Sequence, residues 1–176
     1  MMSSRSERSI QEMKQDFLER LFFPISYDIF LCDSLLETPI EKAMALALLF
    51  ADYGCDWEAY GQQRITEGDW ECFKDLDKDS LVIQPQRNVG KYRVDLAIRV
   101  SVDGRVMLLA VECDGHDFHH ATKAQVERDK KRDRFLAAEG YKVLRFPGSV
   151  IYRDVESCAN EVVDIVQSFI GGHING

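Results

Sequence analysis

Three acidic side chains are expected to converge near the end of one strand. Asp95 lies within the expected strand Tyr92–Val100, and Glu112 and Asp114 close the next apolar run. Glu112 and Asp114 are two residues apart, so both side chains leave the same face of an extended strand. Converging carboxylates repel one another unless a cation neutralises them, and hard oxygen ligands favour Mg²⁺ or Mn²⁺. The sequence therefore predicts a divalent metal site, and a metal-free Asp114-Gly115 turn is the alternative explanation.

Three of the four histidines follow directly, as His116, His119 and His120. A histidine beside a metal-bound carboxylate cluster can move a proton or contact a scissile phosphate. Neutral imidazoles can instead bind zinc, and a polar surface loop is the third explanation. Because no H-E-x-x-H spacing exists, the zinc interpretation is the weakest of the three.

The acidic residues need a sheet to position them, and the apolar patterning supplies one. The turn Asp103-Gly104 is typical of a hairpin, which would place Asp95 near the end of the following strand. A continuously apolar run up to Glu112 indicates a central strand. The expected strands are Leu81–Gln84, Tyr92–Val100, Val106–Glu112 and Tyr141–Phe146.

Helical spacing appears on both sides of these strands. Thr38-Pro39-Ile40-Glu41 is a capping box that opens a buried helix ending near Gly54, and Gly140 closes a helix over Ala121–Glu139. Further helices are expected over Ser9–Phe23 and Asp154–Ile170, with loop and irregular helix over Cys55–Ser80. The order α-α-β-β-β-α-β-α predicts an α/β fold with one central mixed β-sheet flanked by helices.

The helix over Ala121–Glu139 carries acids where apolar residues are expected. Asp129 and Asp133 share a stripe with Val126 and Leu136, so both acids would face the core. A buried ion-pair network that anchors the helix under the acidic site explains them, which makes both acids structural rather than catalytic.

The composition is that of one globular domain. The chain has 176 residues, a hydrophobic share of 45% and a formal net charge of −8. The charge is uneven, because residues 28–79 hold thirteen acids and four bases, whereas residues 121–146 hold eight bases and four acids. The basic region can attract phosphates while the rest of the surface repels them, although solvated helix faces explain the same run.

Cysteine usage and hydropathy point to the cytoplasm. The five cysteines stand singly without a C-x-x-C pair, which argues against a disulfide framework or a structural zinc site. No apolar run approaches the roughly 18 residues that span a bilayer, and the first residues lack the apolar stretch of a secretory signal. We therefore expect a cytoplasmic protein without a membrane partner.

Several separated motifs resemble a family of bacterial endonuclease-like domains related to very-short-patch repair endonucleases. The matching strings are Tyr-Arg-Val-Asp at 92–95, Glu-x-Asp-Gly at 112–115 with His119, Asp129-x-x-Arg132-Asp133-x-x-Leu136-x-x-x-Gly140, and Val143-Leu144-Arg145-Phe146. Thr38-Pro39-Ile40-Glu41 and Gln86 also match. The resemblance implies an endonuclease-like domain over residues 37–170, preceded by an N-terminal tail and helix (1–36) and followed by a C-terminal tail (171–176).

The resemblance also implies a fold and a set of roles. The family has the PD-(D/E)xK, restriction-endonuclease-like fold, in which a mixed sheet presents acids for a metal. Carried over, Glu41 is the leading acid, Asp95 the central metal ligand and Glu112 the second ligand. Asp114 occupies the place of the usual lysine, and His119 matches a variant of the site in which histidine replaces that lysine.

The function that follows is a metal-dependent endonuclease that hydrolyses DNA phosphodiester bonds. Asp95, Glu112 and Asp114 would bind Mg²⁺ or Mn²⁺, with Glu41 and His119 completing the catalytic set. Substrate contacts are expected from Gln86, Arg128, Lys131 and Arg132. The sequence leaves open RNA as substrate, a homodimer, a partner protein that supplies specificity, and service in repair, defence or a mobile element.

A different class of protein explains part of the same pattern. The missing lysine and the acidic surface favour a catalytically inactive nucleic-acid or protein-interaction domain that keeps the nuclease fold. A nuclease requires a divalent metal, whereas a binding domain keeps its nucleic acid after chelation.

Overall fold

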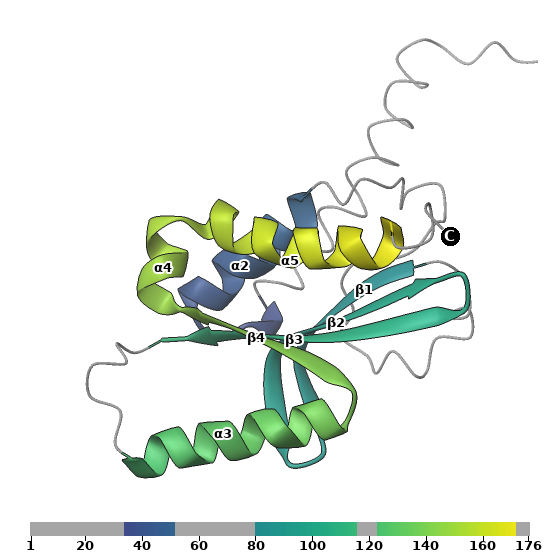
Figure 1. Ribbon diagram of the computed structural model, residues 1–176. Coiled ribbons are helices and arrows are strands. Elements are labelled where there is room, and N and C mark those ends of the chain that lie inside the picture. The colour runs from purple at the N-terminus through teal and green to yellow at the C-terminus, as the bar shows by residue number, and fades with distance from the viewer. Residues whose placement is uncertain (1–33, 52–79, 116–122, 172–176) are drawn as a thin grey trace, which may run out of the picture.

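The computed structural model describes residues 34–51, 80–115 and 123–171 (Figure 1). The predicted helix Ser9–Phe23, nearly all of Cys55–Ser80, and His116, His119 and His120 lie outside the described residues. In chain order the elements are α2 (Pro39–Phe50), β1 (Ser80–Val89), β2 (Tyr92–Val102), β3 (Arg105–Asp114), α3 (Lys123–Ala138), β4 (Tyr141–Pro147), α4 (Gly148–Arg153) and α5 (Val155–Gly171).

The four strands form one sheet in the order β1-β2-β3-β4. β1, β2 and β3 are antiparallel neighbours, whereas β4 runs parallel to β3 and is reached through α3. Helices α2, α4 and α5 cover one face of the sheet, and α3 covers the other (Figure 1). This arrangement confirms the predicted α/β class with a central mixed sheet and is consistent with a restriction-endonuclease-like fold.

Two apolar clusters hold the layers together. The larger one fills the space between the sheet and α2, α4 and α5, with Met44, Leu48, Ile98, Leu109 and Val162 fully buried. The smaller one lies under α3. No helix among the described residues is both long and apolar enough to cross a membrane.

The helix ends follow local sequence signals. Thr38 and Glu41 form the predicted capping box, with the Thr38 hydroxyl accepting a hydrogen bond from the Glu41 N–H at 3.3 Å. Gly140 follows α3 with a φ of 86°, as expected for a residue that terminates a helix. α2 ends at Phe50, earlier than predicted. The sequence also does not predict α4, which has six residues, too few for a helical period to stand out.

The strand predicted over Leu81–Gln84 is wrong in length. β1 continues through Pro85 to Val89, with Arg87 paired opposite Val94 of β2. Proline breaks apolar alternation in the sequence, but an edge strand tolerates it because the outer side needs no ladder hydrogen bond. The extension places polar residues of β1 beside Asp95.

β2 leaves β3 before either strand ends. Their last paired residues are Leu96 and Val111, beyond which residues 92–94 pair only with β1 and residues 112–114 only with β4. We call the two diverging segments, residues 92–95 and residues 112–114, the fork. The expected alternation in β2 also breaks here, because Val94 packs in the cluster under α3 and not with Leu96 and Ile98.

The turn between β1 and β2 packs on α3. Gly90 has a φ of 56°, and a Cβ there would lie 2.6 Å from the Phe135 ring. The Tyr92 and Phe135 rings meet edge to face with centroids 5.3 Å apart. This contact fixes α3 against the β1–β2 branch of the fork.

We expect Gly90→Ala to lower the free energy of unfolding by about 2–3 kcal/mol. About 1 kcal/mol comes from a side chain in the left-handed region, and the rest from displacing Phe135. Gly104→Ala is the control, because Gly104 has a φ of 72° with open space around it and should lose only about 1 kcal/mol. Urea unfolding measures both, and equal losses would show that the contact with Phe135 has no role.

Candidate active site

The fork brings Asp95 beside the end of β3. Asp95 Oδ2 accepts a hydrogen bond from the Cys113 backbone N–H at 2.8 Å, which takes the place of a ladder bond between β2 and β3. In this position Asp95 lies within electrostatic range of Glu112, Asp114 and Glu41. The structure therefore gathers the predicted acids from three elements into one region.

Glu112 is paired with an arginine of α3. Arg132 Nη2 donates hydrogen bonds to Glu112 Oε1 and Oε2 at 2.6 and 2.5 Å, and the Glu112 side chain is only 1% exposed. The same Nη2 donates to the Arg93 carbonyl at 2.5 Å. Because Arg93 belongs to β2 and Glu112 to β3, Arg132 joins the two branches of the fork.

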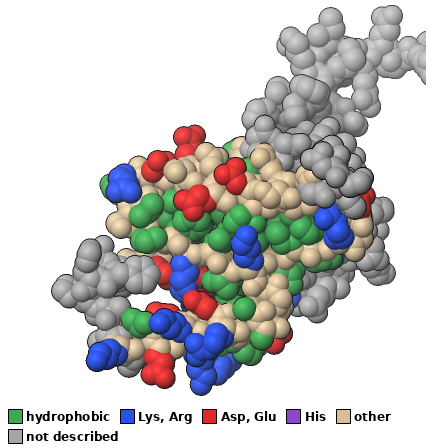
Figure 2. All heavy atoms as spheres, viewed as in Figure 1, with side chains coloured by type: hydrophobic (Ala, Val, Ile, Leu, Met, Phe, Trp, Pro, Cys, Tyr) green, Lys and Arg blue, Asp and Glu red, His purple; other side chains and the backbone are tan. Residues whose placement is uncertain are grey.

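Asp114 is held by a second arginine. Arg145 Nη1 lies 3.2 Å from Asp114 Oδ1, and Arg145 Nη2 lies 2.7 Å from Asp133 Oδ1 on α3. Arg145 also stands opposite Glu112 in the β3–β4 register. Acidic and basic side chains accordingly lie together in the recess between α4 and α3 (Figure 2). This ion-pair chain ties β3, β4 and α3 at the edge of the site.

The prediction that both α3 acids face the core needs correction. Asp133 forms an ion pair with Arg145, but its side chain is 39% exposed and not buried as predicted. Asp129 is exposed, and Val126 is 41% exposed. α3 packs on the sheet through Phe135 and Leu136 near its C-terminal end. Its first half therefore stands clear of the core, and the apolar stripe does not continue along it.

Glu41 reaches the site from the first turn of α2. Its Oε2 accepts hydrogen bonds from the backbone N–H groups of Glu37 and Thr38, at 3.1 and 3.4 Å, and from Gln86 Nε2 at 3.0 Å. The capping box therefore fixes the leading acid that the resemblance implies, and it couples that acid to β1.

Burial, with a smaller effect from neighbouring carboxylates, raises the pKa values of Glu112 and Asp95. Burial raises the pKa of Glu112 from its ordinary 4.5 to about 7; Asp95 and Asp114 add to the rise, and Arg132 opposes it. Burial also raises the pKa of Asp95, and the hydrogen bond from the Cys113 N–H lowers it by a smaller amount. Burial and the same carboxylates raise the pKa of the Cys113 thiol, which therefore stays protonated. Glu112 and Asp95 therefore hold a proton more tightly than ordinary carboxyl groups do.

The oxygen atoms of the fork fit a divalent cation, although the described residues do not offer a ready-made set of three carboxylate ligands. Across the described ranges, no group of three or more His, Cys, Asp or Glu side chains is placed to hold a metal ion. Mg²⁺, however, commonly uses one or two carboxylates and keeps several waters. Asp95 and Glu112 supply two such carboxylates, and a buried oxygen, Gln86 Oε1, has no hydrogen-bond donor among the described residues. Burial first and repulsion between carboxylates second raise both pKa values, and a hard cation would offset both effects.

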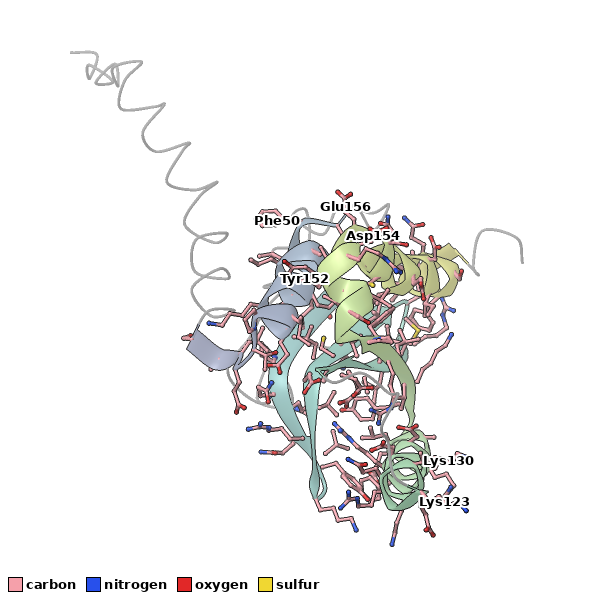
Figure 3. The ribbon with its side chains drawn as sticks, turned by 90° about the vertical axis from the view of Figure 1, so that its left-hand side faces the viewer. Phe50, Lys123, Lys130, Tyr152, Asp154 and Glu156 are labelled. Carbon is pink, nitrogen blue, oxygen red and sulfur yellow. The ribbon has the colours of Figure 1, made fainter. Side chains whose placement is uncertain are left out.

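The bases predicted to contact substrate divide into two groups. Arg128 and Lys131 lie on the exposed side of α3, where Lys123 and Lys130 also point away from the helix (Figure 3). Arg132 instead turns into the fork and bonds Glu112. The exposed group forms a basic surface on α3.

Arg145 is a residue of the site to which the sequence assigns no role, although it belongs to one of the family motifs. The expected strand Tyr141–Phe146 holds two cations, Lys142 and Arg145, and the sequence does not tell them apart. In the structure Lys142 is exposed, whereas Arg145 is partly buried and forms ion pairs with Asp133 and Asp114.

A family model described as REase_MTES_1575 matches residues 69–166, more than half of the chain. The chain belongs to this family. The REase_MTES_1575 family is restriction-endonuclease-like, and the match spans β1 to most of α5, including Asp95, Glu112 and Asp114. No curated protein and no solved structure gave a significant match.

The raised pKa of Glu112 predicts a pH dependence of stability. Between about pH 4.5 and 7 the folded protein keeps a proton on Glu112 that the unfolded chain has lost, so stability falls as the pH rises through this range. Glu112→Gln should show a smaller fall between pH 5 and 8 than wild type, measured by urea unfolding. Exposed Glu161→Gln on α5 is the control and should keep the wild-type slope. An unchanged slope in Glu112→Gln would contradict the raised pKa.

Proposed function

We propose that this chain is a metal-dependent endonuclease that hydrolyses DNA phosphodiester bonds. The observation that carries the proposal is the fork, where buried Glu112 and hydrogen-bonded Asp95 lie close enough for their charges to interact, in a chain of a restriction-endonuclease-like family. Two carboxylates with raised pKa values in one recess are typical of a site whose charge is balanced by a cation or used in proton transfer.

The site residues have distinct roles in this proposal. Asp95 and Glu112 would hold Mg²⁺ or Mn²⁺, and Asp114 would support them. When bound, such a cation would supply activation of water and compensation of the charge that develops on the phosphate. Arg132 keeps Glu112 oriented, and Glu41 adds negative charge from α2. His119, outside the described residues, is proposed for acid–base work or phosphate contact.

The basic surface of α3 is proposed to hold the nucleic-acid backbone. Arg128 and Lys131 are exposed on α3, and such side chains bind phosphates without reading sequence. Binding of this kind would weaken as salt rises, because counterions released from the backbone drive it.

Several finer attributes belong to the same proposal. A specific relationship to very-short-patch repair endonucleases, DNA rather than RNA as substrate, and a cytoplasmic location rest on sequence resemblance and hydropathy. A homodimer or a partner protein is proposed as the source of specificity.

A second function is favoured by one observation. Arg132 and Arg145 already engage Glu112 and Asp114, so part of the negative charge is offset without a metal. A nucleic-acid or protein-interaction domain that keeps the nuclease fold would need only these arginines, and no metal, to balance the charge of its acidic residues.

Asp95→Asn and Glu112→Gln test the nuclease directly. Each removes one charge of the proposed metal site with little change in shape, and each should lower Mg²⁺- or Mn²⁺-dependent nicking of a supercoiled plasmid by at least about 100-fold. Gel analysis of nicked product over time measures the rate.

Asp164→Asn is the matched control, because Asp164 is an exposed carboxylate of α5, and this variant should nick DNA at the wild-type rate. Wild-type protein that binds DNA equally with and without chelator, and nicks with neither ion, would establish the interaction domain instead.

A further inference from the structure

Gln86 adopts a conformation that its residue type does not favour. Its φ is 51°, in the left-handed region, although it is neither glycine nor at the end of β1. Non-glycine residues persist in this region when their surroundings hold them there, and such positions cluster at functional sites. The backbone at Gln86 turns the side chain away from the regular alternation of the strand and toward α2.

The two ends of the Gln86 amide have different environments. Nε2 donates to Glu41 Oε2 at 3.0 Å. Oε1 is buried and has no hydrogen-bond donor among the described residues. Buried polar oxygens are rarely left without a partner, so this one calls for a cation or a water.

Gln86 also stands next to the central acid. The pairs Pro85–Leu96 and Arg87–Val94 flank it, which places it opposite Asp95 in the register of β1 and β2. The Glu41 carboxylate that Gln86 bonds is close enough for its charge to act on Asp95. Gln86, Glu41 and Asp95 therefore lie at one end of the fork.

We propose that Gln86 Oε1 is an oxygen donor to the divalent cation held by Asp95 and Glu112. This role rests on the proposed function and differs from the substrate contact expected from the sequence. An amide oxygen is a hard ligand and carries no charge. It can complete a site in which a third nearby carboxylate, Asp114, is held by Arg145.

The competing role is that Gln86 only orients Glu41 through Nε2. Two substitutions separate these roles because they change the oxygen and the donor differently. Gln86→Met removes both groups. Gln86→Glu keeps an oxygen at the same place, removes the donor and adds repulsion toward Glu41.

Calorimetric titration of Mn²⁺ into the full chain measures the affinity of each variant. We expect Gln86→Met to weaken Mn²⁺ binding roughly tenfold or more. Gln86→Glu should bind Mn²⁺ at least as tightly as wild type and should melt at a lower temperature without the metal. Equal weakening in Gln86→Glu and Gln86→Met would show that Gln86 only orients Glu41 and would overturn the proposal.

Gln84→Met is the matched control on the same strand. Gln84 Oε1 already accepts a hydrogen bond from Arg87 Nη1 at 2.7 Å, so its loss should leave Mn²⁺ affinity unchanged. Wild-type Mn²⁺ affinity in Gln86→Met would overturn this inference alone, provided that Asp95→Asn abolishes binding. Wild-type protein that binds no Mn²⁺ would overturn the inference together with the proposed metal site.

Discussion

The pair formed by Arg132 and Glu112 is the interaction on which the site depends. One nitrogen of Arg132 bonds both carboxylate oxygens of Glu112 and the carbonyl of Arg93, so it spans the gap that opens where β2 leaves β3. Without this cation, a carboxylate that is 1% exposed would lose the two hydrogen bonds that Arg132 donates to it. A buried charge without a partner is strongly destabilising, so the fork and the arginine have to be present together.

The rest of the fold serves to place that arginine and the acids around it. Phe135 lies three residues after Arg132 and packs against the turn at Gly90, which sets the rotation of α3 over the fork. Arg145 ties the same helix to β4 through Asp133. On the opposite side of the sheet, the capping box of α2 holds Glu41 toward β1. The acidic residues therefore converge from β2, β3 and α2 because each element is anchored separately.

Much of the fold could be predicted from the sequence because its elements carry strong local signals. The capping box at Thr38, the Asp103-Gly104 turn and the apolar run before Glu112 each depend on neighbouring residues alone. Asp95 and Glu112 could be located because the hairpin between them sets their register. Gln86 and Arg145 could not be assigned in the same way. The left-handed backbone at Gln86 and the partners of Arg145 result from long-range packing, which no local pattern encodes.

The most direct test of the central claim is an X-ray structure of the full chain soaked in Mn²⁺, with anomalous data collected at the manganese edge. The account predicts one anomalous peak in the fork, within direct coordination distance of carboxylate oxygens of Asp95 and Glu112. A fork that stays closed by Arg132 with no peak, at a Mn²⁺ concentration where the protein nicks DNA, would contradict it.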